Sequence, residues 1–342
     1  MILETLKLYA HRNFLTFETQ FHSGLNIICG PNGSGKTSFL EALYVLSTGH
    51  SFRTRDIAPL IHYNESQLTV FAKTRDDQTV SIAKYHRQPT QVKINNQSCT
   101  SAAVLTKMLP CQVFYASIFQ VIDAGPSVRR EILDWGMFHV KHDFYETWKQ
   151  YRRVLKQRNA LLHKSNKKND FLVWDKALVE LADVLDQMRK TYFEQWSHHF
   201  YDQLSQLTDL DCELEYYKGW DKRNTHVSLQ SVLDESFEMD KAKRYTHHGP
   251  HQADILITHQ DKKAKHHFSR GQQKLILLAL KTAQAQMLAE PCIYLFDDLK
   301  AELDDKNFNK TMDYVSNLKG QKFVTLLDDA LCDEASFKIY LM

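Results

Sequence analysis

Eight residues near the N-terminus could bind the phosphate groups of a nucleotide. Residues 30–37 read Gly-Pro-Asn-Gly-Ser-Gly-Lys-Thr and fit the pattern G-x-x-x-x-G-K-[ST] at every fixed position. Glycines let the backbone turn its N–H groups inward around a polyphosphate, and the positive end of a following helix faces the same anion. In such loops the lysine reaches the β- and γ-phosphates and the threonine holds Mg²⁺. The residues predicted to bind a nucleoside triphosphate are Gly30, Pro31, Asn32, Gly33, Ser34, Gly35, Lys36, Thr37 and Ser38.

The sequence on both sides of the loop supports this interpretation. The apolar residues Leu25, Ile27 and Ile28 precede the loop as a strand would, and helix formers follow it from Phe39 to Leu46. The alternative is a chance match in a flexible Gly/Ser loop, which would not need a strand before it and a helix after it. The pattern therefore predicts a phosphate-binding loop between a strand and a helix.

Two carboxylates form a second candidate group. The apolar run from Ile293 to Phe296 ends in Asp297 and Asp298, as a strand delivers side chains to the carboxyl edge of a parallel sheet. Asp297 is predicted to orient Mg²⁺ and its waters. Asp298 is predicted to face the γ-phosphate and position the attacking water, so that Asp298 and Lys36 are the candidate catalytic residues. Alternatively, two acids after a strand simply cap a turn.

A basic segment suggests a polyanionic partner. Residues 149–168 contain eight Lys or Arg residues and no acid, a local charge of +8 in a chain of net charge +2, which leaves about −6 for the rest. Apolar residues recur there at helical spacing, so the basic residues would share the opposite helix face. A solvated face, a membrane surface or an acidic partner are the alternatives. If that partner is a nucleic acid, the absence of a base-reading motif favours contacts to its backbone, from Arg152, Arg153, Lys156 and Arg158.

Composition places the chain among ordinary globular proteins. Its 342 residues are 43% hydrophobic and 25% charged, which is enough length for two domains. No apolar run approaches the roughly 20 residues that cross a bilayer, so we expect a soluble cytoplasmic protein without a membrane partner. The six cysteines include no C-x-x-C pair, which argues against a zinc ribbon or a disulfide framework.

The order of patterns predicts an α/β fold with an inserted helical lobe. Residues 1 to about 112 alternate as strands do around the loop and one helix, whereas residues 127–207 show the three-to-four-residue period of long helices. A second α/β portion follows the helices. We therefore predict a discontinuous ATP-binding head, residues 1–112 and 242–342, with a mainly helical insert at 113–241 that folds as an antiparallel helical pair.

A third motif resembles the signature sequence of ABC-type ATPases. Residues 268–274 read Phe-Ser-Arg-Gly-Gln-Gln-Lys and precede a strongly apolar helix. The resemblance implies that Ser269, Gly271 and Gln272 contact the γ-phosphate of an ATP held by a second subunit, which makes the dimer depend on ATP. Residues 301–304, Ala-Glu-Leu-Asp, would resemble the dimer-contacting D-loop of that superfamily. The alternative is a plain serine N-cap with a glycine turn.

The long insert and further motifs narrow the resemblance to the RecF family. These motifs are collinear over nearly the whole chain: Arg12-Asn13-Phe14, Ser51-Phe52-Arg53, Gly125 to His139, Leu155 to Leu162 and His248 to Asp254. The resemblance implies an SMC-like head of the P-loop ABC type, ATP contacts by Arg12 and Asn13, and Gln112 as a link to Mg²⁺. It also implies a DNA-binding protein of gap repair, replication and SOS induction that works with RecO and RecR to load RecA.

The sequence departs from that family at several positions. It has Ala116-Ser117 where a Pro-Glu pair is common, Ala301 where the D-loop has serine, and Phe268 where the signature begins with leucine. Residues 326–328, Leu-Leu-Asp, supply no switch histidine. These differences concern hydrolysis and dimer affinity more than ATP binding. We expect a weak, DNA-stimulated ATPase; a scaffold that binds ATP with negligible hydrolysis and a transporter-type nucleotide-binding subunit remain the alternatives.

Overall fold

The chain folds into two compact units, residues 1–119 with 288–342 and residues 120–287. The computed structural model describes residues 1–99, 102–115, 122, 125–141, 143–165, 167–222, 225–260, 262–263, 267–327 and 337–341. The predicted α/β class and the discontinuous head are both present. The second head boundary lies at 288 and not at 242, because residues 254–259 pair with a strand of the second unit and residues 270–286 pack on its longest helix.

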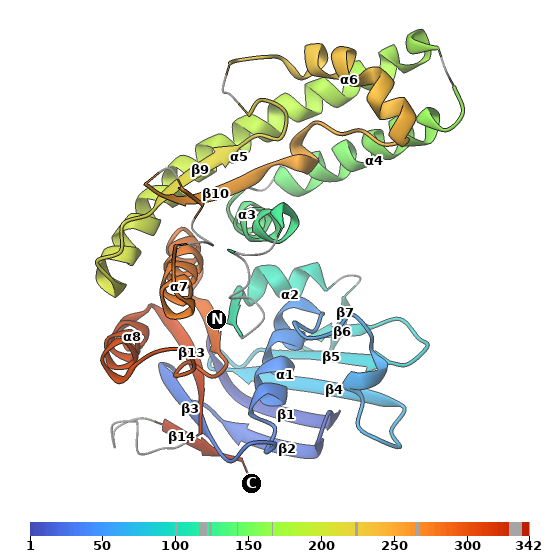
Figure 1. Cartoon of the computed structure of the whole chain (residues 1–342). Helices are drawn as coiled ribbons and strands as arrows, with labels where there is room; N and C mark the ends of the chain where they lie inside the picture. The colour runs from blue at the N-terminus through green and yellow to red at the C-terminus, as the bar shows by residue number, and fades with distance from the viewer. Residues whose placement is uncertain are drawn as a thin grey trace. The chain divides into compact units, whose positions relative to one another are not determined.

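The first unit contains a five-stranded parallel sheet in the order β14-β3-β13-β12-β8, of which Figure 1 labels β14, β3 and β13. Apart from the edge strand β14, these short strands are almost continuously buried, as strands covered on both faces are. Their carboxyl ends meet at one edge, which is where ligands bind in such sheets. The strands are β3 (Leu25–Cys29), β8 (Cys111–Phe114), β12 (Cys292–Phe296), β13 (Gly320–Leu326) and β14 (Phe337–Tyr340).

An antiparallel sheet of six strands completes the first unit. Its order is β2-β1-β4-β5-β6-β7, and buried residues alternate with partly exposed ones along β4 and β5 because only one face packs on the core. The strands are β1 (Leu3–His11), β2 (Phe14–Gln20), β4 (Gln67–Thr74), β5 (Thr79–Tyr85), β6 (Gln91–Ile94) and β7 (Gln97–Cys99).

Helix α1 (Lys36–Thr48) joins the two sheets into one core. It contacts strands of both sheets, and most of its side chains are buried, including those of Phe39, Leu43 and Leu46. Between Phe39 and Leu46 the helix is apolar nearly all round except for Glu41, which is typical of such a central position. The remaining elements of this unit are η1 (Ala58–Leu60), α2 (Ala103–Met108) and α8 (Asp305–Asn317).

The second unit is mainly helical. Helices α4 (Phe144–Leu162) and α5 (Leu172–Leu207) are joined by η3 (Lys168–Phe171) and pack along each other, as the helical period predicted (Figure 1). Helix α7 (Arg270–Gln286) packs on α5, where the Trp196 indole donates to the carbonyl of Leu280 at 2.8 Å. The other elements are α3 (Pro126–Val140), β9 (Glu213–Tyr217), α6 (Leu229–Lys243), η4 (Pro250–Gln252), β10 (Asp254–His259) and β11 (Lys262–Lys263).

Arg158, one of the arginines predicted to contact DNA, lies in the interior of the second unit. Arg158 is fully buried, and its guanidinium donates to Asp175 at 2.6 Å and to Asp240 at 2.7 Å. The assignment of Arg158 to the DNA surface is therefore wrong. It follows Tyr151 by seven residues and precedes Leu162 by four, so helical geometry places it on the buried face of α4.

No helix in the described part of the chain is long and apolar enough to cross a membrane.

Replacing Arg158 should destabilise the second unit far more than replacing its exposed neighbour. Arg158→Ala leaves Asp175 and Asp240 buried without their cation, a loss of about 3–5 kcal/mol, whereas Arg152→Ala should change stability by less than about 0.5 kcal/mol. All five tryptophans lie between residues 135 and 220, so tryptophan fluorescence during urea unfolding reports this unit. Equal midpoints for the two variants would contradict a stabilising buried cluster.

Candidate nucleotide-binding site

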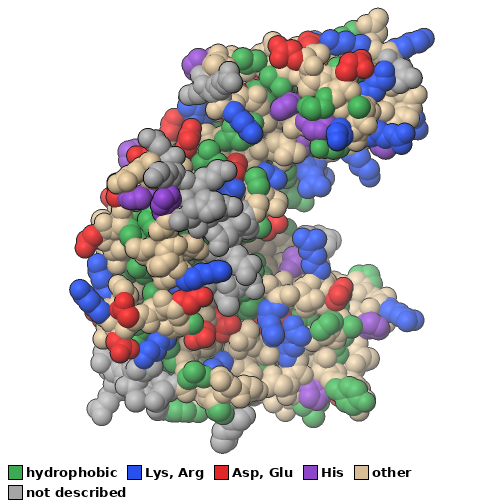
Figure 2. All heavy atoms as spheres, in the orientation of Figure 1, with side chains coloured by type: hydrophobic (Ala, Val, Ile, Leu, Met, Phe, Trp, Pro, Cys, Tyr) green, Lys and Arg blue, Asp and Glu red, His purple; other side chains and the backbone are tan. Residues whose placement is uncertain are grey.

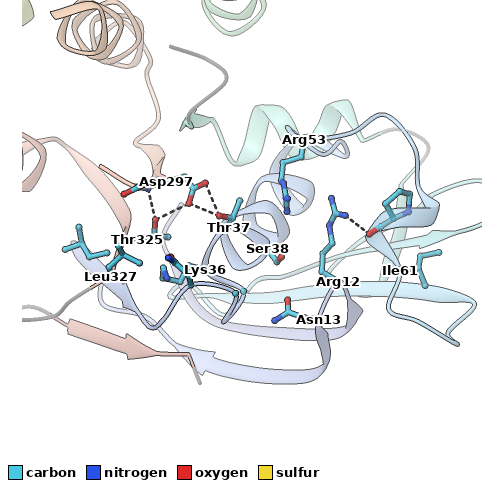
Figure 3. Close-up of a pocket in the computed structure, with 16 residues that line it drawn as sticks. Arg12, Asn13, Lys36, Thr37, Ser38, Arg53, Ile61, Asp297, Thr325 and Leu327 are labelled. Carbon is cyan, nitrogen blue, oxygen red and sulfur yellow. Dashed lines mark hydrogen bonds between the residues drawn. The ribbon is translucent and has the colours of Figure 1, made fainter. Parts of the chain in front are cut away.

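A cavity of about 590 Å³ lies at the carboxyl edge of the parallel sheet, within the range of small-ligand sites (Figure 3). It lies wholly within the first unit. Of the residues predicted from the sequence, those that line it are Arg12, Asn13, Asn32, Gly33, Gly35, Lys36, Thr37, Ser38, Asp297 and Asp298. The sequence prediction thus brings the loop, the Arg-Asn pair and both carboxylates to one place.

The loop between β3 and α1 depends on glycine. Gly35 caps the N-terminus of α1 with φ 99°, and a Cβ atom there would lie 2.4 Å from Nδ2 of Asn13. Asn13 in turn donates from Nδ2 to the carbonyl of Ser34 at 3.3 Å. The Lys36 ammonium folds back into the loop and donates to the carbonyls of Gly30 at 2.6 Å and Pro31 at 2.8 Å. Gly30, Pro31 and Ser34 thus shape the loop without lining the cavity.

A hydroxyl and a carboxylate link the loop to the neighbouring strand. Thr37, in the first turn of α1, donates from Oγ1 to the two carboxylate oxygens of Asp297 at 3.1 and 3.0 Å. Thr325, near the end of β13, donates to the same carboxylate at 3.1 Å. Figure 3 shows the three side chains converging beside Lys36. Oxygen atoms of this kind are the ligands that Mg²⁺ prefers, so Thr37 and Asp297 fit the ion that the sequence predicts.

Asp297 carries its charge in an unfavourable position. Burial raises the pKa of its carboxyl above the ordinary value of 3.8, and the hydrogen bonds from Thr37 and Thr325 offset only part of that increase. A negative charge held in a partly dry site is what a divalent cation would stabilise.

Asp298 faces outward from the same strand end. Its backbone has φ 52°, in the left-handed region that residues other than glycine rarely adopt, and its N–H donates to Oγ1 of Thr325 at 2.8 Å. The side chain is exposed and lines the cavity. The turn therefore separates two adjacent carboxylates, one inside the hydroxyl cluster and one open to the cavity.

Gln112 does not join this group. In β8 it pairs with Tyr294 of β12, three residues before Asp297, which is about 10 Å along a strand. It is buried and does not line the cavity. The assignment of Gln112 to Mg²⁺ is therefore wrong, because the residue lies inside its strand and not at the edge where the ligands gather. Ala116, Ser117 and Asp328 lie outside the described residues.

The ABC-like signature lies in the second unit, at the N-terminus of α7. Ser269 caps the helix, its Oγ accepting from the N–H of Gln272 at 3.3 Å while Oε1 of Gln272 accepts from the N–H of Ser269 at 2.9 Å. This capping box satisfies two of the free N–H groups of the helix start. The serine N-cap, which is the alternative interpretation of this motif, is thus present. The role of Ser269, Gly271 and Gln272 toward a nucleotide remains a prediction.

Several residues that line the cavity were not predicted as site residues. They are Arg53, Pro59, Ile61, Thr325, Leu326 and Leu327. Thr325 follows an apolar run much as Asp297 does, and this strand-end position is the signal that could have identified it. Arg53 belongs to a motif that the sequence offers only as a family marker. Pro59 and Ile61 belong to no sequence motif. They line the cavity only because the chain between α1 and β4 passes beside it.

The chain resembles known proteins over nearly its whole length. The RecF/RecN/SMC N-terminal domain family matches residues 2–341. A protein of Francisella tularensis subsp. tularensis called DNA replication and repair protein RecF is 36% identical over 332 residues, which are 95% of this chain and 94% of that protein. A protein of Francisella tularensis subsp. holarctica with the same name is 35% identical over the same shares.

Solved structures share the fold. A structure of the recombination mediator protein RecF with ATP, described as part of the RecFOR pathway, has a TM-score of 0.86 at 24% identity and covers 99% of this chain and 95% of its own. An SMC head bound to the C-terminal winged-helix domain of ScpA has a TM-score of 0.58 at 18% identity, covering 97% and 91%. The predicted ABC/SMC-type head is confirmed.

The raised pKa of Asp297 predicts a pH-dependent penalty on stability. Because the folded carboxyl holds its proton more tightly than the unfolded one, ionisation destabilises the nucleotide-free fold at every pH above the folded pKa, and the penalty vanishes below the ordinary value of 3.8. Asp297→Asn should therefore be more stable than the wild type at pH 7, and the difference should shrink toward pH 4.

Hydrogen exchange of β12 amides at several pH values measures this difference. Asp305→Asn, an exposed carboxylate of the same unit that pairs with Lys300, is the matched control and should show no such gain. A wild type more stable than Asp297→Asn at pH 7 would contradict the account of this carboxylate.

Proposed function

The chain belongs to the RecF/RecN/SMC family, and from that premise we propose that it is an ATP-binding and ATP-hydrolysing protein of DNA repair and replication. The observation that carries the proposal is the cavity in which a phosphate-binding loop meets the Thr37–Asp297 pair. A relative 36% identical over 95% of the chain bears the name of a DNA replication and repair protein, which supports the same assignment.

The described residues divide the work on ATP. The loop N–H groups and Lys36 hold the phosphates, with the positive end of α1 directed at them. Thr37 and Asp297 hold Mg²⁺, which neutralises charge that develops on the phosphate oxygens. Asp298 reaches the cavity from the exposed side of its turn, where a carboxylate positions the attacking water. Arg12 and Asn13 line the cavity as additional contacts to the nucleotide.

A second copy of the chain supplies the remaining contact. The start of α7 is exposed at Ser269 and Arg270, and none of the described residues accepts a hydrogen bond from the N–H of Arg270 or Gly271. These free N–H groups and the positive helix end suit the γ-phosphate of an ATP bound by another protomer. The proposed active form is therefore a homodimer that closes when ATP is bound and opens when ATP is hydrolysed.

DNA binding is assigned to the exposed face of α4. Arg152, Arg153 and Lys156 are exposed and form no ion pair with any described residue. Basic side chains gather over the region where α4 lies (Figures 1 and 2). Without the buried Arg158, this set has three candidates on the helix surface, which suit the sugar-phosphate backbone more than base edges. Proteins of the RecO and RecR type are the proposed partners in loading RecA.

Substituting Asp298 should trap the ATP-bound dimer. Asp298→Asn keeps the shape of the side chain but cannot position the attacking water, so hydrolysis should slow by about 100-fold or more while ATP binding persists. Lys36→Ala is the matched loss-of-binding variant and should stay monomeric. Sedimentation velocity after addition of ATP and Mg²⁺ measures the dimer lifetime. An Asp298→Asn dimer that dissociates as fast as the wild type in ATP would remove Asp298 from this role.

Neutralising the α4 surface should flatten the salt dependence of DNA affinity. For duplex DNA, the slope of log affinity against log salt concentration falls by about 0.9 for each phosphate that the protein no longer neutralises, so Arg152→Gln/Arg153→Gln/Lys156→Gln should reduce it by up to about 2.7. Lys306→Gln/Lys310→Gln on α8 removes exposed charge from the other unit and is the control. Fluorescence anisotropy at several salt concentrations gives the slope. An unchanged slope for the triple variant would exclude α4 as the DNA surface.

A further inference from the structure

A buried carboxylate lies directly behind the nucleotide cavity. Glu41 is fully buried in α1, four residues after Thr37 and therefore on the same side of the helix one turn further on. A buried carboxylate is unstable unless it is paired and hydrogen-bonded. The partners of Glu41 are therefore expected to be fixed as firmly as Glu41 itself.

The principal partner is Arg12, which lines the cavity. Its Nε and one terminal nitrogen donate to the two oxygens of Glu41 at 2.7 and 2.8 Å, the bidentate arrangement that fixes a guanidinium most strongly. The other terminal nitrogen donates to the carbonyl of Pro59 at 2.7 Å. A guanidinium has five N–H bonds, so one bond on each terminal nitrogen remains without an acceptor among the described residues.

The backbone of Arg12 is fixed as well. Its φ of 55° is in the left-handed region, and such strain persists only where surrounding contacts hold it. The N–H of Arg12 donates to the carbonyl of Leu60 at 2.8 Å. The carbonyl oxygen of Arg12 lies 2.7 Å from Nδ1 of His62. Residues 60 and 62 thus hold the backbone of Arg12, while Glu41 holds its guanidinium.

A second arginine depends on the same carboxylate. Ser51 donates from Oγ to Glu41, and that same Oγ accepts from the N–H groups of Arg53 at 2.9 Å and Thr54 at 3.1 Å. Ser51 therefore ties the turn that carries Arg53 to α1. The Arg53 guanidinium lines the cavity with its closest terminal nitrogen 3.9 Å from Glu41. Figure 3 shows Arg12 and Arg53 reaching toward each other from separate segments.

The nearby histidine does not share this role. His11 is fully buried, burial lowers its pKa to about 4, and its Nε2 lies 3.1 Å from the carbonyl of Ser38, to which it donates. The imidazole is therefore neutral at physiological pH. Burial raises the pKa of the Glu41 carboxyl, but the hydrogen bonds from Arg12 and Ser51 and the charge of Arg12 together outweigh burial and hold this pKa below its ordinary value, so Glu41 keeps its charge. One carboxylate thus faces two permanently charged arginines.

We propose that Glu41 is a positioning residue that presents Arg12 and Arg53 to the anionic nucleotide as one pre-arranged pair. This inference rests on the proposed function and adds a role for a residue that cannot touch the nucleotide itself. A guanidinium already held in place loses little freedom when the anion binds, so the gain in affinity is larger than from a mobile side chain. The pair also carries one positive charge more than Glu41 cancels, which leaves a positive charge on this side of the cavity, away from Asp297 and Asp298.

A double-mutant cycle tests whether Glu41 acts through Arg12. Isothermal titration of ATP with Mg²⁺ is measured for the wild type, Glu41→Gln, Arg12→Ala and the double variant. Glu41→Gln should weaken ATP binding about tenfold in the wild-type background and by less than about threefold once Arg12 is absent, because contacting residues are not additive. Equal factors in both backgrounds, or an unchanged affinity in Glu41→Gln, would overturn the proposal.

Two further variants separate positioning from folding. Glu18→Gln removes an exposed carboxylate of the same unit, paired with Lys7 at 2.8 Å, and should leave ATP affinity unchanged. If Glu41→Gln does not fold, Ser51→Ala and Arg53→Ala form a second double-mutant cycle. The loss of ATP affinity caused by Ser51→Ala should disappear when Arg53 is absent. A loss that persists without Arg53 would overturn the proposal. A wild type that binds no ATP would instead refute the proposed function.

Discussion

The contact between Thr37 and Asp297 is the constraint on which the rest of the site depends. It joins the first turn of α1 to the end of β12, two segments 260 residues apart in the chain. The two meet only because the strand order β3-β13-β12 brings their carboxyl ends to one edge, with Thr325 of β13 between them. The chain leaves the parallel sheet after β8 and returns at β12, so the whole second unit lies in sequence between two neighbouring strands of this sheet.

The hydrophobic core of the first unit fixes the loop at the carboxyl edge of the parallel sheet. Helix α1 is buried against both sheets, so the loop that precedes it has little freedom, and the positive end of the helix points where the phosphates would lie. That burial also places Glu41 in the interior, where its charge must be paired. Its partners are Arg12 in the β1–β2 turn and, through Ser51, Arg53 in the segment after α1. The antiparallel sheet thereby contributes to a site built mainly on the parallel one.

Residues that act through local chemistry were predictable, whereas those that act through packing were not. The loop at 30–37 and the carboxylates at 297–298 carry their signal within a few residues, and the cavity is lined by both carboxylates and by most of the loop. Glu41 reads as one acid in an apolar helix, and nothing nearby in sequence indicates its partner Arg12. Arg158 was misassigned because a basic run includes buried helix positions, and the boundary at 242 was misplaced because β10 pairs with β9.

The central claim is that this cavity holds ATP and that the γ-phosphate brings two copies of the chain together. Sedimentation velocity of the wild type at one protein concentration, with Mg²⁺ and either ATP or ADP, tests it most directly. We expect a dimer with ATP and a monomer with ADP, because only ATP offers the γ-phosphate that the proposed second copy would contact. The same sedimentation coefficient in both nucleotides would contradict it.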